Sequence, residues 1–232
     1  MKNDIFKIDD KTKYQILLWL IGGLVLVFAT EFFLRGSLYE VWEFFIKTPG
    51  VVLVNYLLIL ILTSIFFFTK RKYLVYFLLF LAILGVSAST FFLMNARGMP
   101  FMFSDLCTLR EAMAIANNYV SKTMIIIAVL CVAFLAIVAV FLYRLNFDTK
   151  RFKLINFVLI FVVCVCFFST LKIQSSLNIM KLNKANITES YECNGFVYST
   201  VESALEYIRT KPSDYSKKNI DKIKEKVDKA TA

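Results

Sequence analysis

Five long stretches without a charged side chain constrain this chain more than any other feature of its sequence. They hold 17 to 24 residues each and run over 14–30, 48–69, 73–96, 123–143 and 154–171. With a rise of about 1.5 Å per residue, helices of this length match a hydrocarbon core about 30 Å thick. The pattern predicts an all-α, polytopic membrane protein with five transmembrane helices, at about 14–34, 48–69, 73–94, 123–143 and 154–171.

The first stretch has a second interpretation. Val27-Phe28-Ala29 loosely resembles a cleavage site, so residues 1–30 are also compatible with a cleaved signal peptide. The apolar run is longer than the 7–15 residues of a signal h-region, which favours an uncleaved anchor. The span then extends to Leu34, with Glu31 reaching the interface.

Composition agrees with a membrane protein and excludes several classes of enzyme. Of the 232 residues, 59% are hydrophobic and 19% are charged, whereas soluble domains are about 45–50% apolar and about 25% charged. The chain has no histidine, which excludes Ser-His-Asp catalysis, Cys-His catalysis and imidazole metal sites. A soluble enzyme is therefore not expected.

The distribution of Lys and Arg predicts the orientation. With the N-terminus inside, eleven of these side chains before residue 172 lie on the cytoplasmic side and five lie outside. The predicted divisions are a cytoplasmic N-terminus (1–13), a transmembrane domain (14–171) and an extracytoplasmic helical linker (172–232). The net charge of +10 reflects this topology, and no basic stripe with interleaved aromatic residues indicates a nucleic-acid partner.

The outer loop between the third and fourth spans has a distinctive sequence. Gly98 and Pro100 predict a turn that returns the chain to the bilayer, and Ser104 follows in the same motif. From Thr108 onward, apolar residues at helical spacing predict an amphipathic helix, reaching about residue 119, at the outer membrane surface.

Charged residues of this loop are candidates for contact with a lipid headgroup. Arg97 is placed to hold a lipid phosphate, and Asp105 to pair with Arg97 or to cap the following helix. Arg110 lies on the polar side of that helix and completes the candidate set. The simpler alternative is that Arg97 only snorkels and Asp105 is only a cap.

The C-terminal segment predicts two further helices. One follows Gly195, places Tyr198, Val201, Leu205 and Ile208 on one face, and ends at Lys211-Pro212; the other carries Ile220, Ile223 and Val227 in register. Neither buries its apolar face alone, so each is expected to need the membrane surface or a further domain.

Cysteine usage adds little. Cys107 and Cys193 both face outward in this topology and are able to pair, although free thiols are the default expectation. No cysteine spacing indicates a metal site.

Three features of the chain form a pattern. They are the five spans, the loop segment Arg97-Gly-Met-Pro-Phe-Met-Phe-Ser-Asp105-Leu106, and the tail from Asn194-Gly195-Phe196-Val-Tyr198 to Lys211-Pro212-Ser-Asp-Tyr215-Ser216. Together they resemble the membrane portion of the lipoteichoic acid synthase family. These proteins are phosphoglycerol transferases of the sulfatase and alkaline-phosphatase superfamily. The resemblance covers essentially the whole chain. It implies a bacterial cytoplasmic membrane protein with its C-terminus outside.

The resemblance also implies where the chemistry lies. In that family an outer domain after this linker holds a divalent metal, such as manganese, and a threonine nucleophile. It transfers glycerol phosphate from phosphatidylglycerol to a growing polymer. The present chain is expected to lack that domain, so it has no counterpart of a catalytic residue or metal ligand and no cofactor of its own.

Two functions follow as expectations. In the first, the chain anchors an extracytoplasmic catalytic domain, in cis or in trans, and presents membrane lipid, phosphatidylglycerol, near Arg97. In the second, it is a stand-alone small membrane protein with an accessory, regulatory or transport role. The charge-free span interiors do not favour a transporter, and the Gly22-Gly23 pair in the first span is more typical of helix packing than of a substrate site.

Overall fold

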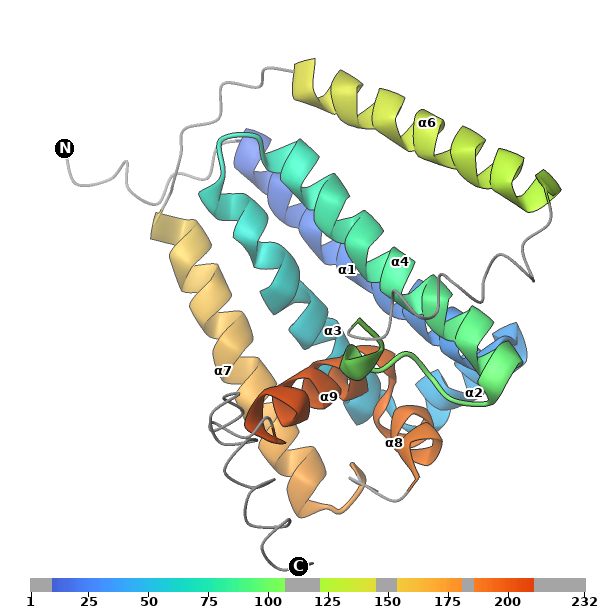
Figure 1. Ribbon diagram of the computed structural model, residues 1–232. Coiled ribbons are helices and arrows are strands. Elements are labelled where there is room, and N and C mark those ends of the chain that lie inside the picture. The colour runs from blue at the N-terminus through green and yellow to red at the C-terminus, as the bar shows by residue number, and fades with distance from the viewer. Residues whose placement is uncertain (1–9, 107–121, 145–153, 181–185, 211–232) are drawn as a thin grey trace, which may run out of the picture.

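The computed structural model describes residues 10–106, 122–144, 154–180 and 186–210, and all regular structure within these ranges is helical (Figure 1). The elements are α1 (Asp10–Arg35), α2 (Leu38–Lys47), α3 (Pro49–Thr63), the 3-10 helix η1 (Ser64–Phe68), α4 (Lys72–Arg97), the 3-10 helix η2 (Phe103–Leu106), α6 (Lys122–Arg144), α7 (Leu154–Ser176), α8 (Ile187–Asn194) and α9 (Phe196–Thr210). The expectation of an all-helical chain is confirmed for this part of the protein.

Four helices are long and apolar enough to cross a membrane. They are Thr12–Arg35, Pro49–Phe68, Lys72–Arg97 and Leu154–Ser176, and each coincides with a predicted span. The predicted span 123–143 corresponds to α6, an apolar helix of 23 residues. The chain is thus a membrane-embedded helical protein, and the fifth span stays a prediction.

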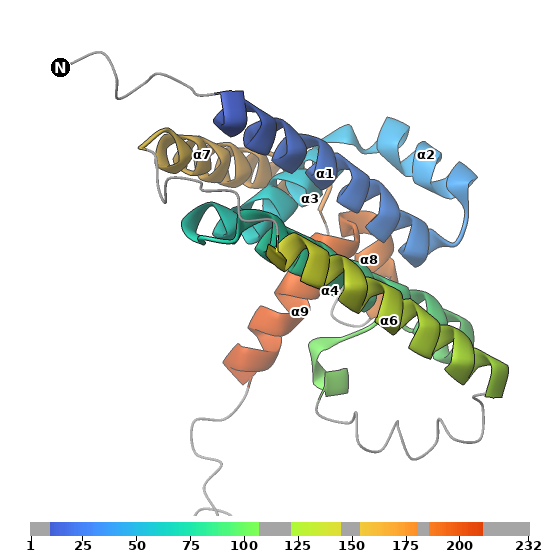
Figure 2. The same ribbon diagram turned by 90° about the horizontal axis from the view of Figure 1, so that it is seen from above.

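The long helices form a bundle with α3 at its centre. α1, α4 and α7 run in one direction and α3 runs in the other, with α3 packed against both α1 and α7 (Figure 1). α6 lies beside α4 in both views (Figure 2). The guanidinium of Arg71, just before α4, lies 3.3 Å from the ring centroid of Tyr143, near the end of α6. This cation–π contact joins the two helices.

The Gly22-Gly23 pair lies where α1 crosses its neighbours. A Cβ on Gly22 would collide with the hydroxyl oxygen of Tyr76 in α4, and a Cβ on Gly23 would be 2.7 Å from Leu60 in α3. Small residues let helices approach closely in a membrane, so the pair has the geometry expected for packing.

The segment between the first two spans contains a helix, α2, that was not predicted from the sequence. α2 buries Val41 and Phe44 and exposes Tyr39, Trp42 and Ile46. Exposed Trp and Tyr side chains next to a span are typical of the membrane–water interface. α2 lies at the same end of the bundle as α8 and α9 (Figure 1).

The helix predicted after Gly195 is present as α9, but its packing differs from the expectation. Its first turn is buried against the chain's own spans, with Phe196 2% and Val197 4% exposed, because α9 packs on α1 and α3. Leu205 and Ile208, farther along, are exposed. The predicted helices that begin at Thr108 and after Pro212 lie outside the described residues.

Candidate functional site

The corner between α8 and α9 is attached to the membrane-spanning helices through its backbone. Gly195 joins the two helices with φ +80° and ψ 163°, so the last carbonyls of α8 and the first amides of α9 lie close together. These groups have no partner within their own helices and need one elsewhere. Side chains of α1 and α3 supply the partners.

Asn55 of α3 binds both helices of the corner. Its Nδ2 donates to the carbonyl oxygen of Asn194 at 2.8 Å, and its Oδ1 accepts from the amide of Tyr198 at 2.9 Å. Asn55 and Asn194 are fully buried. A single amide side chain inside a span therefore caps the end of α8 and the start of α9.

Glu31 and Arg35, one turn apart in α1, make the other two contacts. The Oε1 of Glu31 accepts from the amide of Phe196 at 2.7 Å, which places a carboxylate at the positive N-terminal end of α9. Arg35 donates to the carbonyl oxygen of Glu192 at 2.7 Å and lies 3.9 Å from the ring centroid of Phe44. Arg35 therefore links α1 to both α2 and α8.

The two charges also neutralise each other. Arg35 Nε lies 3.2 Å from Glu31 Oε2, and the side chains are 12% and 0% exposed. Both carboxylate oxygens of Glu31 thus have a donor, which is how a buried charge is accommodated. Glu31 is enclosed by protein rather than placed at the interface as predicted.

Gly195 is required by space as well as by its dihedral angles. A Cβ at this position would lie 2.5 Å from Asn55 Nδ2 and 2.8 Å from Glu31 Oε1. Only glycine allows the backbone to approach these two side chains so closely and to keep a positive φ. We name Glu31, Arg35, Asn55 and Gly195 the corner joint.

The loop after α4 is closed by its own charged pair. Gly98, at φ +71°, ends α4 in the left-handed conformation that glycine adopts readily. Arg97 then makes two hydrogen bonds to the carboxylate of Asp105, one of 2.9 Å through Nη1 and one through Nη2, and also donates to the carbonyl oxygen of Pro100 at 3.1 Å. The amide of Met102 donates to Asp105 at 2.8 Å.

These bonds change the acidity of Asp105. Its partial burial acts to raise the pKa of the carboxyl, but the hydrogen bonds from Arg97 and from the Met102 amide outweigh that effect. The pKa is therefore lowered from 3.8, and Asp105 is ionised at neutral pH. A lipid phosphate would have to compete with this carboxylate for Arg97.

The loop also contacts the two C-terminal helices. Tyr191 of α8 donates its hydroxyl to the carbonyl oxygen of Phe101 at 2.9 Å, and Thr188 donates to that of Gly98 at 3.2 Å. The Phe103 ring lies 5.4 Å from that of Tyr207 in α9. Burial raises the pKa of the Tyr191 hydroxyl, so it remains a protonated donor at neutral pH.

The structure thus brings together the two stretches that the sequence analysis singled out. Arg97, Gly98, Pro100 and Asp105 form one compact loop against α8 and α9, as the contacts above show. The Ser104 side chain and Arg110 lie outside what the structure describes. A lipid role for Arg97, Asp105 and Arg110 stays a prediction.

Sequence reasoning missed the corner joint. Glu31 was predicted to reach the interface, and Asn55 is a single polar residue within the apolar run 51–62. The usable signal was their residue type, because an ionisable or amide group within a span usually has a specific partner. The partners themselves are backbone groups 139 to 165 residues away along the chain.

Within the described ranges, no group of three His, Cys, Asp or Glu side chains could hold a metal ion. Cys193 is a half-buried thiol, and Cys107 lies outside the described residues.

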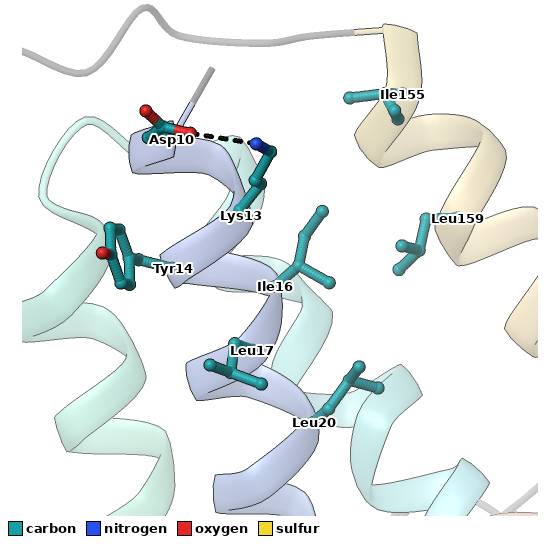
Figure 3. Close-up of a pocket in the computed structure, with 8 residues that line it drawn as sticks. All are labelled: Asp10, Lys13, Tyr14, Ile16, Leu17, Leu20, Ile155 and Leu159. Carbon is teal, nitrogen blue, oxygen red and sulfur yellow. Dashed lines mark hydrogen bonds and ion pairs between the residues drawn. The ribbon is translucent and has the colours of Figure 1, made fainter. Parts of the chain in front are cut away.

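Cavities lie beside the bundle in the part of the chain that the structure describes. One, of about 620 Å³, lies between the first turns of α1 and α7, where Ile16 and Leu20 face Ile155 and Leu159 (Figure 3). Its ionisable groups are the exposed pair Asp10 and Lys13, 3.0 Å apart, together with the Tyr14 hydroxyl. Its walls are otherwise apolar.

The second cavity, of about 670 Å³, lies next to the corner joint between α3, α7 and α9. Its walls combine apolar side chains of two spans with charged side chains of α9. The lining residues are Leu58, Phe167, Phe168, Leu171, Tyr198, Val201, Glu202, Leu205, Glu206 and Arg209.

Comparisons with known proteins leave the family open. No family model, no curated protein and no solved structure matches the chain.

Proposed function

We propose that this chain is the membrane module of a phosphoglycerol transferase similar to the lipoteichoic acid synthases. In this role it anchors an extracytoplasmic catalytic domain, in cis or in trans, and presents phosphatidylglycerol to it. The module itself performs no chemistry. The catalytic residues and the divalent metal belong to the outer domain.

The observation that carries the proposal is the attachment of α9 to two spans at once. Glu31 binds the first amide of α9 from α1, and Asn55 binds the third from α3. Two hydrogen bonds from different helices fix the direction of α9, whereas a single hydrogen bond would let α9 rotate about it. The direction of α9 is therefore set at the end of the bundle, as the anchor of a catalytic domain requires.

The contact between the loop and the tail gives further support. The resemblance to the family rests on residues 97–106 and on the tail from Asn194, and these segments lie against each other where Phe103 contacts the Tyr207 ring and donates its amide to the Ser203 hydroxyl. Segments that carry a family pattern and share one surface are expected to serve one function.

The proposed topology has five spans with the N-terminus inside the bacterial cytoplasmic membrane. The excess of Lys and Arg on one side favours it. So does α6, which runs opposite to α4 and brings Tyr143, near its end, to Arg71 at the start of α4 (Figure 1). The corner joint then faces the extracytoplasmic side, where the outer domain acts.

Glycerol phosphate transfer in proteoliposomes tests the proposal. The full chain, joined after Ala232 to an outer domain of the family, is reconstituted with phosphatidylglycerol, and transfer is compared with that of the same domain on an unrelated single-span anchor. We expect a rate at least about tenfold higher with this chain, because positioning at the bilayer raises the effective substrate concentration.

A matched pair of variants separates positioning from simple anchoring. Gly195→Ala disrupts the corner joint and should reduce the rate to that of the unrelated anchor. Gly85→Ala, in α4 with no atom within 4 Å of the added Cβ, should leave the rate unchanged. Equal rates for this chain and the unrelated anchor would refute the proposed function.

A further inference from the structure

We propose that α2 docks on the lipid bilayer at the end of the bundle that carries α8 and α9, and that this contact helps to hold Arg35 in the corner joint. The docking face consists of Leu38, Tyr39, Trp42 and Ile46. The inference rests on α2 and on its contacts with the first span. It does not require that the chain serve a transferase.

The side chains of α2 fall into three faces. Successive residues of an α-helix are rotated by about 100°, so positions three and four apart share a face. Val41 and Phe44 form the buried face, and Glu40, Glu43 and Lys47 form a charged face. The docking face is the third, and its four side chains are 61% to 76% exposed. A helix between protein and water needs only two faces, so the third indicates a further, apolar environment.

The position of α2 identifies that environment as lipid. Only Gly36 and Ser37 separate α2 from α1, and only Thr48 separates it from α3. The ring of Phe45, near the end of α2, lies 6.1 Å from that of Phe28 in α1. Phe28 lies seven residues before the end of α1, which is about 10 Å along the helix axis. α2 therefore folds back along the apolar part of the first span instead of extending into water.

The chemistry of the docking face suits the boundary of a bilayer. Tyr39 and Trp42 combine an apolar ring with a polar tip, and both residue types are enriched at the membrane–water interface. Phe28, the span residue that α2 contacts, is 39% exposed, so the lipid-facing surface of the first span reaches the level of α2. The charged face carries the exposed ion pair of Glu43 and Lys47, which stays in water. An amphipathic helix at an interface has this division of side chains.

The buried face of α2 reaches the corner joint. The ring centroid of Phe44 lies 3.9 Å from the guanidinium carbon of Arg35. The same guanidinium donates to the carbonyl oxygen of Glu192 and pairs with Glu31. Displacement of α2 from the bilayer would move the Phe44 ring away from Arg35, and a cation–π contact would be lost. α2 thus links the bilayer to the side chains that set the direction of α9.

Quenching of tryptophan fluorescence by brominated lipid tests the docking. The chain has two tryptophans, Trp42 and the fully buried Trp19. The full chain is reconstituted in phosphatidylcholine vesicles whose acyl chains carry bromine either near the headgroup or near the bilayer centre. In Trp19→Phe the remaining Trp42 should be quenched strongly, and more by bromine near the headgroup. In Trp42→Phe the remaining Trp19 should be quenched much less.

The difference between the wild type and Trp42→Phe gives the Trp42 signal without a change at Trp19. Trp42 emission that is insensitive to both brominated lipids would overturn the docking. Water on this face would shift the emission to longer wavelength, and a second copy of the chain or another protein would shield Trp42 from lipid. Stronger quenching from the bilayer centre would also overturn it, because α2 would then lie too deep for the bilayer surface.

A matched pair of serine variants tests the link to the corner joint. Trp42→Ser removes the largest side chain of the docking face, and Phe92→Ser removes an aromatic side chain of α4 with similar exposure, 66% against 63%. In phosphatidylcholine vesicles, hydrogen exchange in residues 195–200 should rise about twofold to fivefold in Trp42→Ser, the effect of losing one cation–π contact. It should stay unchanged in Phe92→Ser. Phe44→Leu, which removes the ring beside Arg35, should raise exchange to a similar extent.

The exchange data can contradict the link separately from the docking. Unchanged exchange in Trp42→Ser, or an equal rise in Phe92→Ser, would show that the bilayer contact of α2 does not act on the corner joint. Neither measurement uses a catalytic domain or a particular headgroup, so this proposal and the transfer rate in proteoliposomes fail independently.

Discussion

At the end of the bundle that carries α8 and α9, distant segments are held by buried side-chain hydrogen bonds to backbone groups. At the opposite end aromatic packing is the main contact, and buried hydrogen bonds of Trp19 and Lys72 accompany it. The corner joint binds four backbone groups of α8 and α9 through Glu31, Arg35 and Asn55. At the other end Trp19, fully buried, packs edge-on to Phe67 with ring centroids 5.1 Å apart.

The two ends differ in what they contribute to the structure: one holds the spans together, and the other sets the direction of α9. Apolar packing is not directional and is satisfied by many arrangements of similar volume. Hydrogen bonds to named backbone atoms are satisfied by one arrangement, and a buried group left without its partner is costly. The aromatic end thus holds the spans together, and the polar end sets where α9 points.

The largest expected effect comes from Glu31→Leu. The change leaves Arg35 without its carboxylate and the Phe196 amide without an acceptor, so we expect a loss of about 3–5 kcal/mol at the corner joint. Hydrogen exchange measured by mass spectrometry should rise in residues 195–200, because the first amides of α9 become free.

Trp19→Phe is the matched change at the aromatic end. It removes the hydrogen bonds of Nε1 to Leu60 and Thr63, so it should lower the melting temperature in detergent without raising exchange in residues 195–200. If both variants raise exchange there equally, the two ends are not independent and the comparison fails.

A smaller effect is expected from Gly195→Ala. The added Cβ meets Asn55 and Glu31 and forces an alanine to φ +80°, which should cost about 2–3 kcal/mol. Exchange should rise in the same peptide as for Glu31→Leu, since both changes open the same joint. Gly85→Ala is the control and should leave this peptide protected; protection that survives Gly195→Ala would show that the corner adapts.

The sequence predicted the spans well because each depends on a property of a continuous segment. Uncharged runs long enough for the bilayer are visible without knowledge of neighbours, and four of them agree with long apolar helices. The pairing of Arg97 with Asp105, raised as one alternative, was accessible for the same reason, because the residues are eight positions apart.

The corner joint was not predictable in that way. Glu31 and Phe196 are separated by 165 residues, and the acceptor meets a backbone amide that any residue would supply. Nothing in the identity of Phe196 marks it as a partner. α2 was missed for a different reason, since Glu40, Glu43 and Lys47 interrupt a short helix and give it the composition of a loop.

The smallest effect tests the loop pair, which is polar like the corner joint but partly exposed. The Arg97 and Asp105 side chains are 37% and 16% exposed, so solvent screening limits their contribution to less than about 1 kcal/mol. Because folding lowers the pKa of Asp105 below 3.8, the stabilisation is present above that pH and is lost as the pH falls through the lowered value.

Asp105→Asn measures the contribution of this ion pair to stability, since asparagine still accepts a hydrogen bond from the Met102 amide but carries no charge. The variant should melt slightly below the wild type at pH 7, and the two should converge as the pH falls through the lowered pKa of Asp105 and the wild-type carboxyl becomes protonated. Glu43→Gln, in the exposed pair with Lys47, should show a difference no larger. If the difference in melting temperature between Asp105→Asn and the wild type persists or widens at low pH, shape rather than charge closes this loop. The direction of α9 would then depend on the corner joint alone.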